Sequence, residues 1–251
     1  MCQLRVLSYN IQAGIYTRRY SEYLTKSWKH LLPHRERLDN LNRIAHLVRG
    51  FDLVGLQEVD GGSLRSAFVN QIEYLARLGH FPYWYRQVNR NLGKFAQHSN
   101  GLLSRLRPNR VLEYRLPGLP GRGAVIAELP TSDGKILAIC IVHLALGRRA
   151  RRHQLRYIEQ LTAAYPYLIL MGDFNCDSKS PILRALVRKT QLQGLDGELR
   201  TFPSWRPKRN LDHILLSSNL RILDHRVIDY PLSDHLPIST TIALPEGVSI
   251  P

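Results

Sequence analysis

Short apolar runs recur along the whole chain and constrain its fold more than any other feature. They are rich in Val, Ile, Leu and Tyr, and Gly, Pro, Asn or Asp lies near most of their ends, which is typical of β-strands. The runs cover Leu4–Ile11, Asp52–Glu58, Gly101–Ser104, Ala124–Leu129, Lys135–His143, Tyr167–Met171, Leu211–Leu216 and Ile238–Leu244. The pattern predicts a protein built around β-sheet.

Three segments between these runs have the three- and four-residue apolar spacing of amphipathic helices: Arg35–Arg49, Ala67–Leu78 and Arg149–Ala164. The strands outnumber the helices, and the helices do not strictly alternate with them. This favours an α/β fold of two packed sheets with helices on the outer faces over a parallel doubly wound sheet. Internal repeats and Gly/Ser linkers are absent from the sequence, so we interpret residues 1–251 as a single domain.

Polar side chains stand at the edges of six of the apolar runs. They are Asn10, Glu58, His143, Asp173 with Asn175, Asp212, and Asp234 with His235. Taken singly, each has a structural explanation, such as a hydrogen-bonded core histidine, a carboxylate facing water or a turn residue. Taken together they indicate a functional site, because groups on strand ends are positioned by a rigid scaffold and converge at one rim of a sheet.

The segments that carry these residues resemble, in order, the signature motifs of the endonuclease/exonuclease/phosphatase family. The segments are 7–11 (LSYNI), 56–59 (LQEV), 142–144 (VHL), 172–175 (GDFN), 211–214 (LDHI) and 233–237 (SDHLP). Segments 99–105 (SNGLLSR) and 201–205 (TFPSW) resemble the bacterial metal-dependent hydrolase branch of that family. The resemblance implies a four-layered α/β sandwich of two facing, mainly antiparallel sheets flanked by helices.

The resemblance also implies a role for each strand-end residue in phosphoester cleavage. Glu58, with Asn10, corresponds to the metal position, and carboxylate and amide oxygens suit Mg²⁺ or Mn²⁺. Asp234 would help ligate the metal or position His235. Asp173 would orient and deprotonate the attacking water. The remaining roles are hydrogen bonds to phosphate from His143 and Asn175, and a pairing of Asp212 with His235 that keeps the imidazole cationic.

Substrate contacts are predicted from the charge and from residues near these motifs. The chain has 35 Lys and Arg against 20 Asp and Glu, a formal charge of +15 that attracts anions such as nucleic acid, anionic lipid headgroups or soluble phosphates without choosing between them. In much of the resembled family the second residue after the first-motif Asn is acidic or otherwise supports the metal, whereas here it is Gln12. The predicted substrate-binding residues are Gln12, Asn100, Arg105, Arg148, Arg149 and Trp205.

We expect a nuclease that acts on DNA or RNA, and two alternatives stay open. The first is a phospholipid or small phosphate ester as substrate, with anionic lipid contacted through the aromatic segment Gly14–Pro33. The second is an inactive relative that only binds, although the metal carboxylate and the terminal histidine are both present.

The cysteines, the N-terminal residues and the lengths of the apolar stretches indicate the cellular compartment. Cys2, Cys140 and Cys176 lack disulfide-framework or metal-ligand spacing, which suits reduced thiols in the cytoplasm. The sequence contains neither a signal-peptide pattern at its start nor an apolar stretch of the ~20 residues that span a bilayer, so stable membrane insertion is not expected. Oligomeric state is left open by the sequence.

Overall fold

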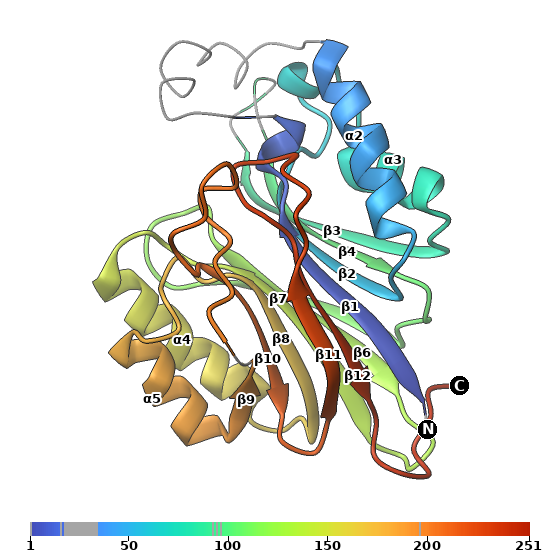
Figure 1. The fold of residues 1–251 in the computed structure, drawn as a ribbon, viewed down its shortest axis with the longest axis vertical. Helices are drawn as coiled ribbons and strands as arrows, with labels where there is room; N and C mark the ends of the chain where they lie inside the picture. The colour runs from blue at the N-terminus through green and yellow to red at the C-terminus, as the bar shows by residue number, and fades with distance from the viewer. Residues whose placement is uncertain are drawn as a thin grey trace.

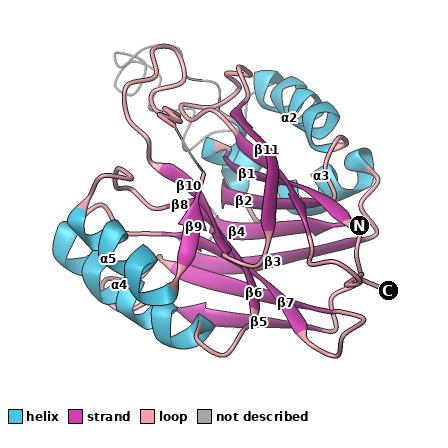
Figure 2. Ribbon diagram, turned by 60° about the horizontal axis from the view of Figure 1, so that its bottom comes forward, coloured by secondary structure: helices cyan, strands magenta, loops and turns pink. Residues whose placement is uncertain are grey.

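The computed structural model describes residues 2–15, 17, 35–91, 93, 95, 97–195 and 197–251. Two six-stranded sheets face each other in it, as Figures 1 and 2 show. The fold is therefore the predicted α/β sandwich of two mainly antiparallel sheets, with helices on both outer faces.

The first sheet has the strand order β11-β12-β1-β2-β4-β3. Its strands are β1 (Gln3–Asn10), β2 (Leu53–Val59), β3 (Tyr83–Asn91), β4 (Gln97–Ser104), β11 (Arg221–Val227) and β12 (Ile238–Ala243). β1 and β2 are parallel, and the other pairs are antiparallel. A parallel pair needs a crossover connection, and α2 (Arg35–Val48) lies between β1 and β2 in the chain.

The second sheet has the order β5-β6-β7-β8-β10-β9. Its strands are β5 (Arg110–Arg115), β6 (Gly123–Pro130), β7 (Ile136–His143), β8 (Tyr167–Asp173), β9 (Leu192–Gly194) and β10 (Asp212–Ser217). Here β7 and β8 form the parallel pair, and α4 (Arg148–Thr162) connects them. The remaining pairs are antiparallel.

Alternation along the central strands builds three apolar layers. In β7, Leu137, Ile139 and Ile141 pack between the sheets, whereas Ala138, Cys140 and Val142 pack under the outer helices. In β1, Val6 faces the other sheet and Leu7 faces α2. Both faces of these strands are buried, which explains why they read as nearly continuous apolar runs.

Two helices cover each outer face. α2 and α3 (Gln71–Gly79) pack on the first sheet through Ile44, Val48 and Leu75, and α4 and α5 (Pro181–Thr190) pack on the second through Ile158 and Leu186. α5 begins with a Ser180 side chain that accepts a hydrogen bond from the Leu183 N–H, followed by a proline. Among the described residues no helix is long and apolar enough to cross a membrane.

The structure confirms the eight predicted strands and corrects the boundaries of one helix. The helix expected over Ala67–Leu78 begins at Gln71, because Ala67 and Phe68 adopt left-handed φ angles of 52° and 61°. Four strands and one helix were not predicted: β3, β5, β9, β11 and α5.

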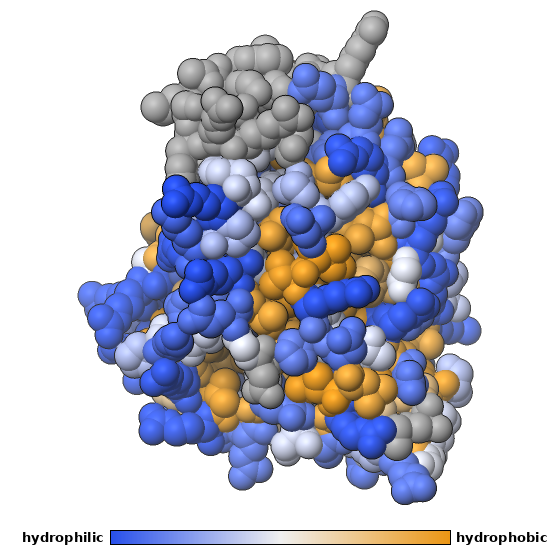
Figure 3. Space-filling model, viewed as in Figure 1, coloured by the Kyte–Doolittle hydropathy of each residue, from blue (hydrophilic) through white to orange (hydrophobic). Residues whose placement is uncertain are grey.

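Figure 3 shows one face of this molecule, on which polar and charged surface surrounds an apolar area in the middle of the view. A cavity of about 540 Å³ lies beside α5, β9 and β10 and is lined by apolar side chains such as Leu183, Val187 and Ile214. None of the predicted catalytic side chains lines it.

Candidate active site

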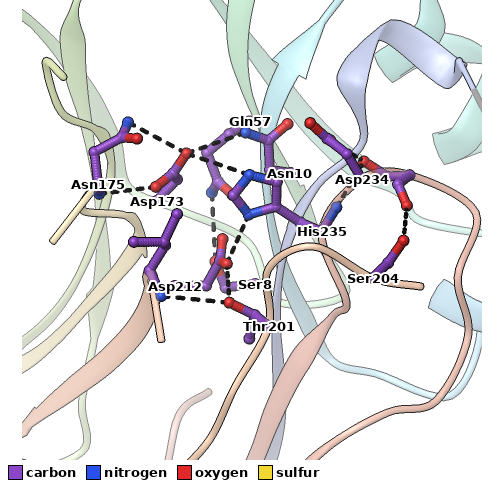
Figure 4. Close-up of polar contacts among 12 residues, drawn as sticks. Ser8, Asn10, Gln57, Asp173, Asn175, Thr201, Ser204, Asp212, Asp234 and His235 are labelled. Atoms are coloured by element: carbon purple, nitrogen blue, oxygen red, sulfur yellow. Dashed lines mark hydrogen bonds and ion pairs between the residues drawn. The ribbon is translucent and has the colours of Figure 1, made fainter. Parts of the chain in front are cut away.

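The predicted strand-end residues meet at one rim of the sandwich. In the first sheet Asn10 lies beside Gln57, the neighbour of Glu58. In the second sheet His143 lies beside Asp173, which in turn lies opposite Asp212. The two sheets are linked there, because the Asn10 Nδ2 donates to Asp173 Oδ2 at 3.2 Å. Figure 4 shows Asn10, Asp173, Asp212 and His235 converging on one space.

Asp173 is the centre of the cluster and is 2% exposed. Its Oδ1 accepts a hydrogen bond from the Asn175 backbone N–H at 2.8 Å, and its Oδ2 lies 3.4 Å from the side-chain Nδ2 of Asn175. The preceding Gly172 has a φ of +143°, and a Cβ there would stand 1.9 Å from the carbonyl oxygen of Val142. Only glycine therefore lets β8 approach β7 closely enough to deliver this carboxylate.

His143 is held in one tautomer by a neighbouring arginine. The Arg122 Nη1 lies 3.2 Å from His143 Nδ1. A guanidinium only donates, so Nδ1 accepts and the proton of the neutral ring is on Nε2. That Nε2 lies 3.4 Å from Asp173 Oδ2 and 3.9 Å from Glu58 Oε1. Burial, followed by the charge of Arg122, holds the pKa of His143 well below its ordinary value, so the ring is neutral.

Asp212 and His235 form a buried pair on the other side of Asp173. The His235 Nδ1 donates to Asp212 Oδ2 at 2.8 Å, and the Thr201 hydroxyl donates to the same oxygen. The other oxygen, Oδ1, is buried and has no hydrogen-bond partner among the described residues. Burial alone would lower the pKa of His235, but the charge and hydrogen bond of Asp212, together with the charges of Asp173 and Asp234, outweigh burial and raise that pKa well above the ordinary value. The imidazole is therefore cationic.

Glu58 is the most accessible carboxylate of the cluster, with 32% of its side chain exposed. Its Oε1 accepts from Asn10 Nδ2 at 3.4 Å, and its φ of 54° is left-handed. Asn175 has a φ of 51°. Two non-glycine residues in this sparsely populated region within one site indicate that the surrounding structure holds them there.

The carboxylates of the rim raise one another's pKa. Burial, and then Asp234, raises the pKa of Glu58. Burial raises the pKa of Asp173 to about 7, with Asp212 and Glu58 adding to the rise and His235 opposing it. So many acidic groups in one cleft create a site whose negative charge a bound cation would neutralise.

Two sets of side chains at the rim offer ligand atoms for a metal ion. One atom each from Asp173, Asp212 and His235 lies within 4.8 Å of the other two. The predicted set of Asn10, Glu58 and Asp234 supplies oxygen ligands only. Asn10 Oδ1 accepts the Gln12 N–H at 3.1 Å and keeps a second lone pair. This donor chemistry fits a hard divalent cation, whereas the cationic His235 has no lone pair to offer while it is protonated.

The sequence match adds the family to this geometry. Residues 7–235 match the endonuclease/exonuclease/phosphatase family. The chain belongs to that family. Enzymes of the family are phosphoesterases that depend on divalent metal ions, so the chain is a hydrolase of this type. No curated protein sequence matches it.

Solved structures show the same fold at low sequence identity. An endonuclease/exonuclease/phosphatase from Beutenbergia cavernae is 18% identical with a TM-score of 0.75, over 97% of this chain and 72% of that one. A mannosyl-6-phosphatase from Bacteroides thetaiotaomicron is 18% identical with a TM-score of 0.69, over 96% and 100% of the two chains. The human Nocturnin catalytic domain, with a bound sulfate anion, is 18% identical with a TM-score of 0.69, over 96% of this chain and 94% of that one.

Within this family fold, the structure assigns two of the predicted substrate contacts to other tasks. Arg105 donates to the carbonyl oxygens of Arg49, Phe51 and His80, next to the start of β2 and not the end that carries Glu58. Asn100 is fully buried and donates to the Gly123 carbonyl at 3.0 Å, which joins the two sheets. These hydrogen bonds give both side chains a structural role, and their contact with substrate stays a prediction.

Gln12 is also occupied by the protein. Its side chain is 5% exposed and its Oε1 accepts from the Thr17 hydroxyl at 2.9 Å. Gln12 therefore supports the turn after Asn10. The side-chain amide of Asn175 donates to the Leu144 carbonyl at 2.9 Å and also faces Asp173. Its hydrogen bond to phosphate stays a prediction.

The other predicted substrate-binding residues lie at the edges of the site. Arg148 and Arg149 are exposed in the first turn of α4, between two residues that line a pocket containing Glu58, Gly147 and Ala150. Trp205 is half-buried beside Ser204, whose backbone N–H donates to the Asp234 carbonyl. Most of the aromatic segment Gly14–Pro33, with Tyr16, Tyr20, Tyr23 and Trp28, lies outside the described residues.

Two residues that matter at the rim were not predicted from the sequence. Thr201 holds Asp212, and Arg122 sets the tautomer of His143. Arg122 precedes the predicted strand Ala124–Leu129 and follows a loop rich in proline and glycine. It therefore shares the strand-end placement of the other site residues, and this placement is visible in the sequence.

Proposed function

We propose that the chain is a Mg²⁺- or Mn²⁺-dependent phosphodiesterase that hydrolyses nucleic acid. The observation that carries the hydrolytic part is the position of Asp173, between the neutral His143 and the cationic His235. Membership of a phosphoesterase family supports the reaction type, and the surplus of positive charge supports a polyanionic substrate.

Asn10, Glu58 and Asp234 would hold the metal ion at the accessible side of the rim. The ion would supply positive charge to the phosphate oxygens and orient the ester.

Asp173 acts as the general base for the attacking water. A base works best when its pKa lies near the working pH, and the pKa of about 7 meets this condition. The base must be deprotonated, so activity should rise as the pH passes through about 7. The hydrogen bond from the Asn175 backbone fixes the carboxylate orientation.

The two histidines act on opposite sides of the base. His143 keeps its proton on Nε2, and this N–H donates a hydrogen bond to a non-bridging phosphate oxygen. His235 stays protonated through Asp212 and stabilises the charge that develops in the transition state. Because this role needs the protonated imidazole, activity should fall at high pH when His235 loses its proton.

A specific observation also favours a second substrate class, the small phosphate ester. The pocket that includes Glu58 has a volume of about 410 Å³, the size of a small-molecule site. The two classes share the catalytic residues and differ in whether Arg148 and Arg149 contribute to binding.

A substrate panel with and without metal tests the proposal. Single- and double-stranded DNA, RNA, a phosphomonoester and sphingomyelin would be assayed in Mg²⁺, Mn²⁺ and EDTA. We expect metal-dependent cleavage of a nucleic acid. Cleavage in EDTA, or turnover of only the phosphomonoester or sphingomyelin, would overturn it.

The salt dependence of binding tests the polymer itself. Log affinity should fall with log salt by ~0.7–0.9 per phosphate contacted. The double variant Arg148→Ala, Arg149→Ala should flatten this slope by about one unit per lost contact. The matched control Arg184→Ala, Arg188→Ala removes the same charge from exposed positions of α5 and should leave the slope unchanged. Equal slopes for all three proteins would remove the α4 arginines from the binding surface.

A further inference from the structure

The pocket beside Glu58 extends away from the catalytic cluster between two loops. One wall is the loop between β5 and β6, with Leu119 and Gly121, and the other is the loop between β7 and α4, with Leu146. Its volume of about 410 Å³ matches one nucleotide-sized group and not a duplex. Since Glu58 lines both the pocket and the catalytic rim, a ligand group in the pocket would adjoin the scissile phosphate.

Two arginines from different strands line this pocket. Arg122 stands at the start of β6 and is half-buried, whereas Arg90 projects from the end of β3 and is exposed. The stem of Arg90 packs on Gly121, where a Cβ would lie 3.3 Å from its Cδ. Gly121 has a φ of +110°, so both the backbone conformation and the close packing of the arginine require glycine here.

The cations dominate the charge of the pocket despite the presence of Glu58. His98, the cross-strand partner of Arg90, also lines it. Burial lowers the pKa of His98 to about 4, and the charges of Arg65, Arg122 and Arg90 add to the effect, opposed by Asp60. His98 is therefore neutral, and the fixed positive charge comes from the two arginines, which suit bidentate binding of phosphate.

One buried side chain holds both wall loops, and two exposed leucines line the pocket. Gln154 is 1% exposed; its Nε2 donates to the Pro117 carbonyl and its Oε1 accepts the Ala145 N–H at 2.8 Å. One buried side chain thus ties both wall loops together. At the mouth Leu119 is 86% exposed and Leu146 is 75% exposed. Such a mouth suits the apolar face of a base or sugar more than a hydrated chain of charges.

We propose that this pocket is a subsite for a second phosphate of the substrate, bound by Arg90 and Arg122 one nucleoside away from the bond that is cleaved. The nucleoside between the two phosphates lies against Leu119 and Leu146. This inference rests on the proposed phosphodiesterase activity and adds which part of the substrate the enzyme recognises.

Two nitrophenyl esters that differ by one phosphate test the subsite. Thymidine 5′-(4-nitrophenyl phosphate) has only the scissile ester, and its 3′-phosphorylated analogue adds the second phosphate. Wild-type protein should hydrolyse the analogue with a kcat/KM about 10- to 100-fold higher, the range expected for charge-assisted hydrogen bonds. Arg90→Ala should bring this ratio below about 3, and Arg90→Glu should bring it below 1. The control Arg184→Ala should leave the ratio unchanged.

Binding measured without turnover separates this inference from the proposed function. Thymidine 3′,5′-bisphosphate and thymidine 5′-monophosphate would be titrated calorimetrically into wild type and Arg90→Ala, with thermal melts confirming that both are folded. Tighter binding of the bisphosphate by wild type alone supports the subsite, even if neither ester is cleaved and the proposed function fails. Cleavage of both esters with equal efficiency and equal binding of both nucleotides would overturn the subsite and leave the function standing.

Discussion

The two halves of the molecule have the same frame and carry different chemistry. The elements β1, α2, β2, α3, β3 and β4 follow one another as β7, α4, β8, α5, β9 and β10 do, and the two sheets contain them in the matching orders β1-β2-β4-β3 and β7-β8-β10-β9. In each half a helix joins a central parallel pair, and functional side chains stand at the ends of that pair.

The side chains at those ends differ in kind. The first half ends in Asn10 and in Glu58, which is partly exposed. The second half ends in His143 and Asp173, both nearly buried, with Asp212 opposite Asp173. The shared strand arrangement places side chains at one rim but does not determine their chemistry. In the proposed mechanism this difference in burial assigns proton transfer to the second half and leaves the accessible carboxylate of the first half for a cation.

The largest effect is expected at the base of the second half. Asp173→Asn keeps the side chain's shape and removes its ability to accept a proton, so kcat should fall by about 10⁴-fold. Added Mg²⁺ or Mn²⁺ should restore nothing, because the lost function is not ligation. The check is single-turnover kinetics over a range of metal concentrations. Recovery of activity at high metal concentration would show that Asp173 is a metal ligand, and the two halves would then not differ in function as proposed.

A somewhat smaller loss is expected for the pair that keeps His235 charged. Asp212→Asn should lower kcat by about 10³-fold with little change in KM, because the interaction strengthens in the transition state. The pKa of His235 is raised by Asp212, so the alkaline limb of the pH profile should move to lower pH in this variant. Thr201→Val, which removes the other donor to the same oxygen, is the milder control. An effect confined to KM would contradict this role.

The first half should respond to metal where the second does not. Glu58→Gln keeps an oxygen ligand and removes the charge, so activity at low Mg²⁺ should fall by about 10²-fold and recover in part at high Mg²⁺. Calorimetric titration of Mn²⁺ should show weaker binding than in wild type, a readout that does not need turnover. Unchanged Mn²⁺ affinity would place the metal elsewhere, for example at Asp173, Asp212 and His235.

The smallest effect on activity is expected at the opposite end of the sandwich. Arg105 contributes hydrogen bonds to backbone carbonyl groups, and its guanidinium lies 4.8 Å from the centre of the Phe81 ring. Arg105→Ala should therefore lower the free energy of unfolding by about 1–3 kcal/mol. Its kcat/KM should stay within twofold of wild type. Denaturant unfolding and steady-state kinetics on the same preparation measure the free energy of unfolding and kcat/KM. A loss of activity without a loss of stability would support the predicted contact of Arg105 with substrate.

The sequence by itself determined the inner part of this protein. All eight predicted strands are inner strands, and β3, β5, β9 and β11, which were not predicted, are the outermost strands of the two sheets. Most inner strands bury both faces and contain long apolar runs, whereas β5 and β11 alternate between exposed and half-buried residues and carry charges. The order of the polar strand ends was equally visible, because each directly follows or precedes an apolar run.

Only the tertiary structure decided which polar groups act together. The bond from Asn10 to Asp173 spans 163 residues, and Arg122 reaches His143 from a neighbouring strand, so no local pattern encodes either contact. Arg105 and Asn100 sit within a recognisable motif, yet their side chains complete hydrogen bonds inside the protein. Local periodicity reports which residues are buried, but the partner of a buried polar group depends on how the two sheets stack, because each such group must find its hydrogen bonds across the interface.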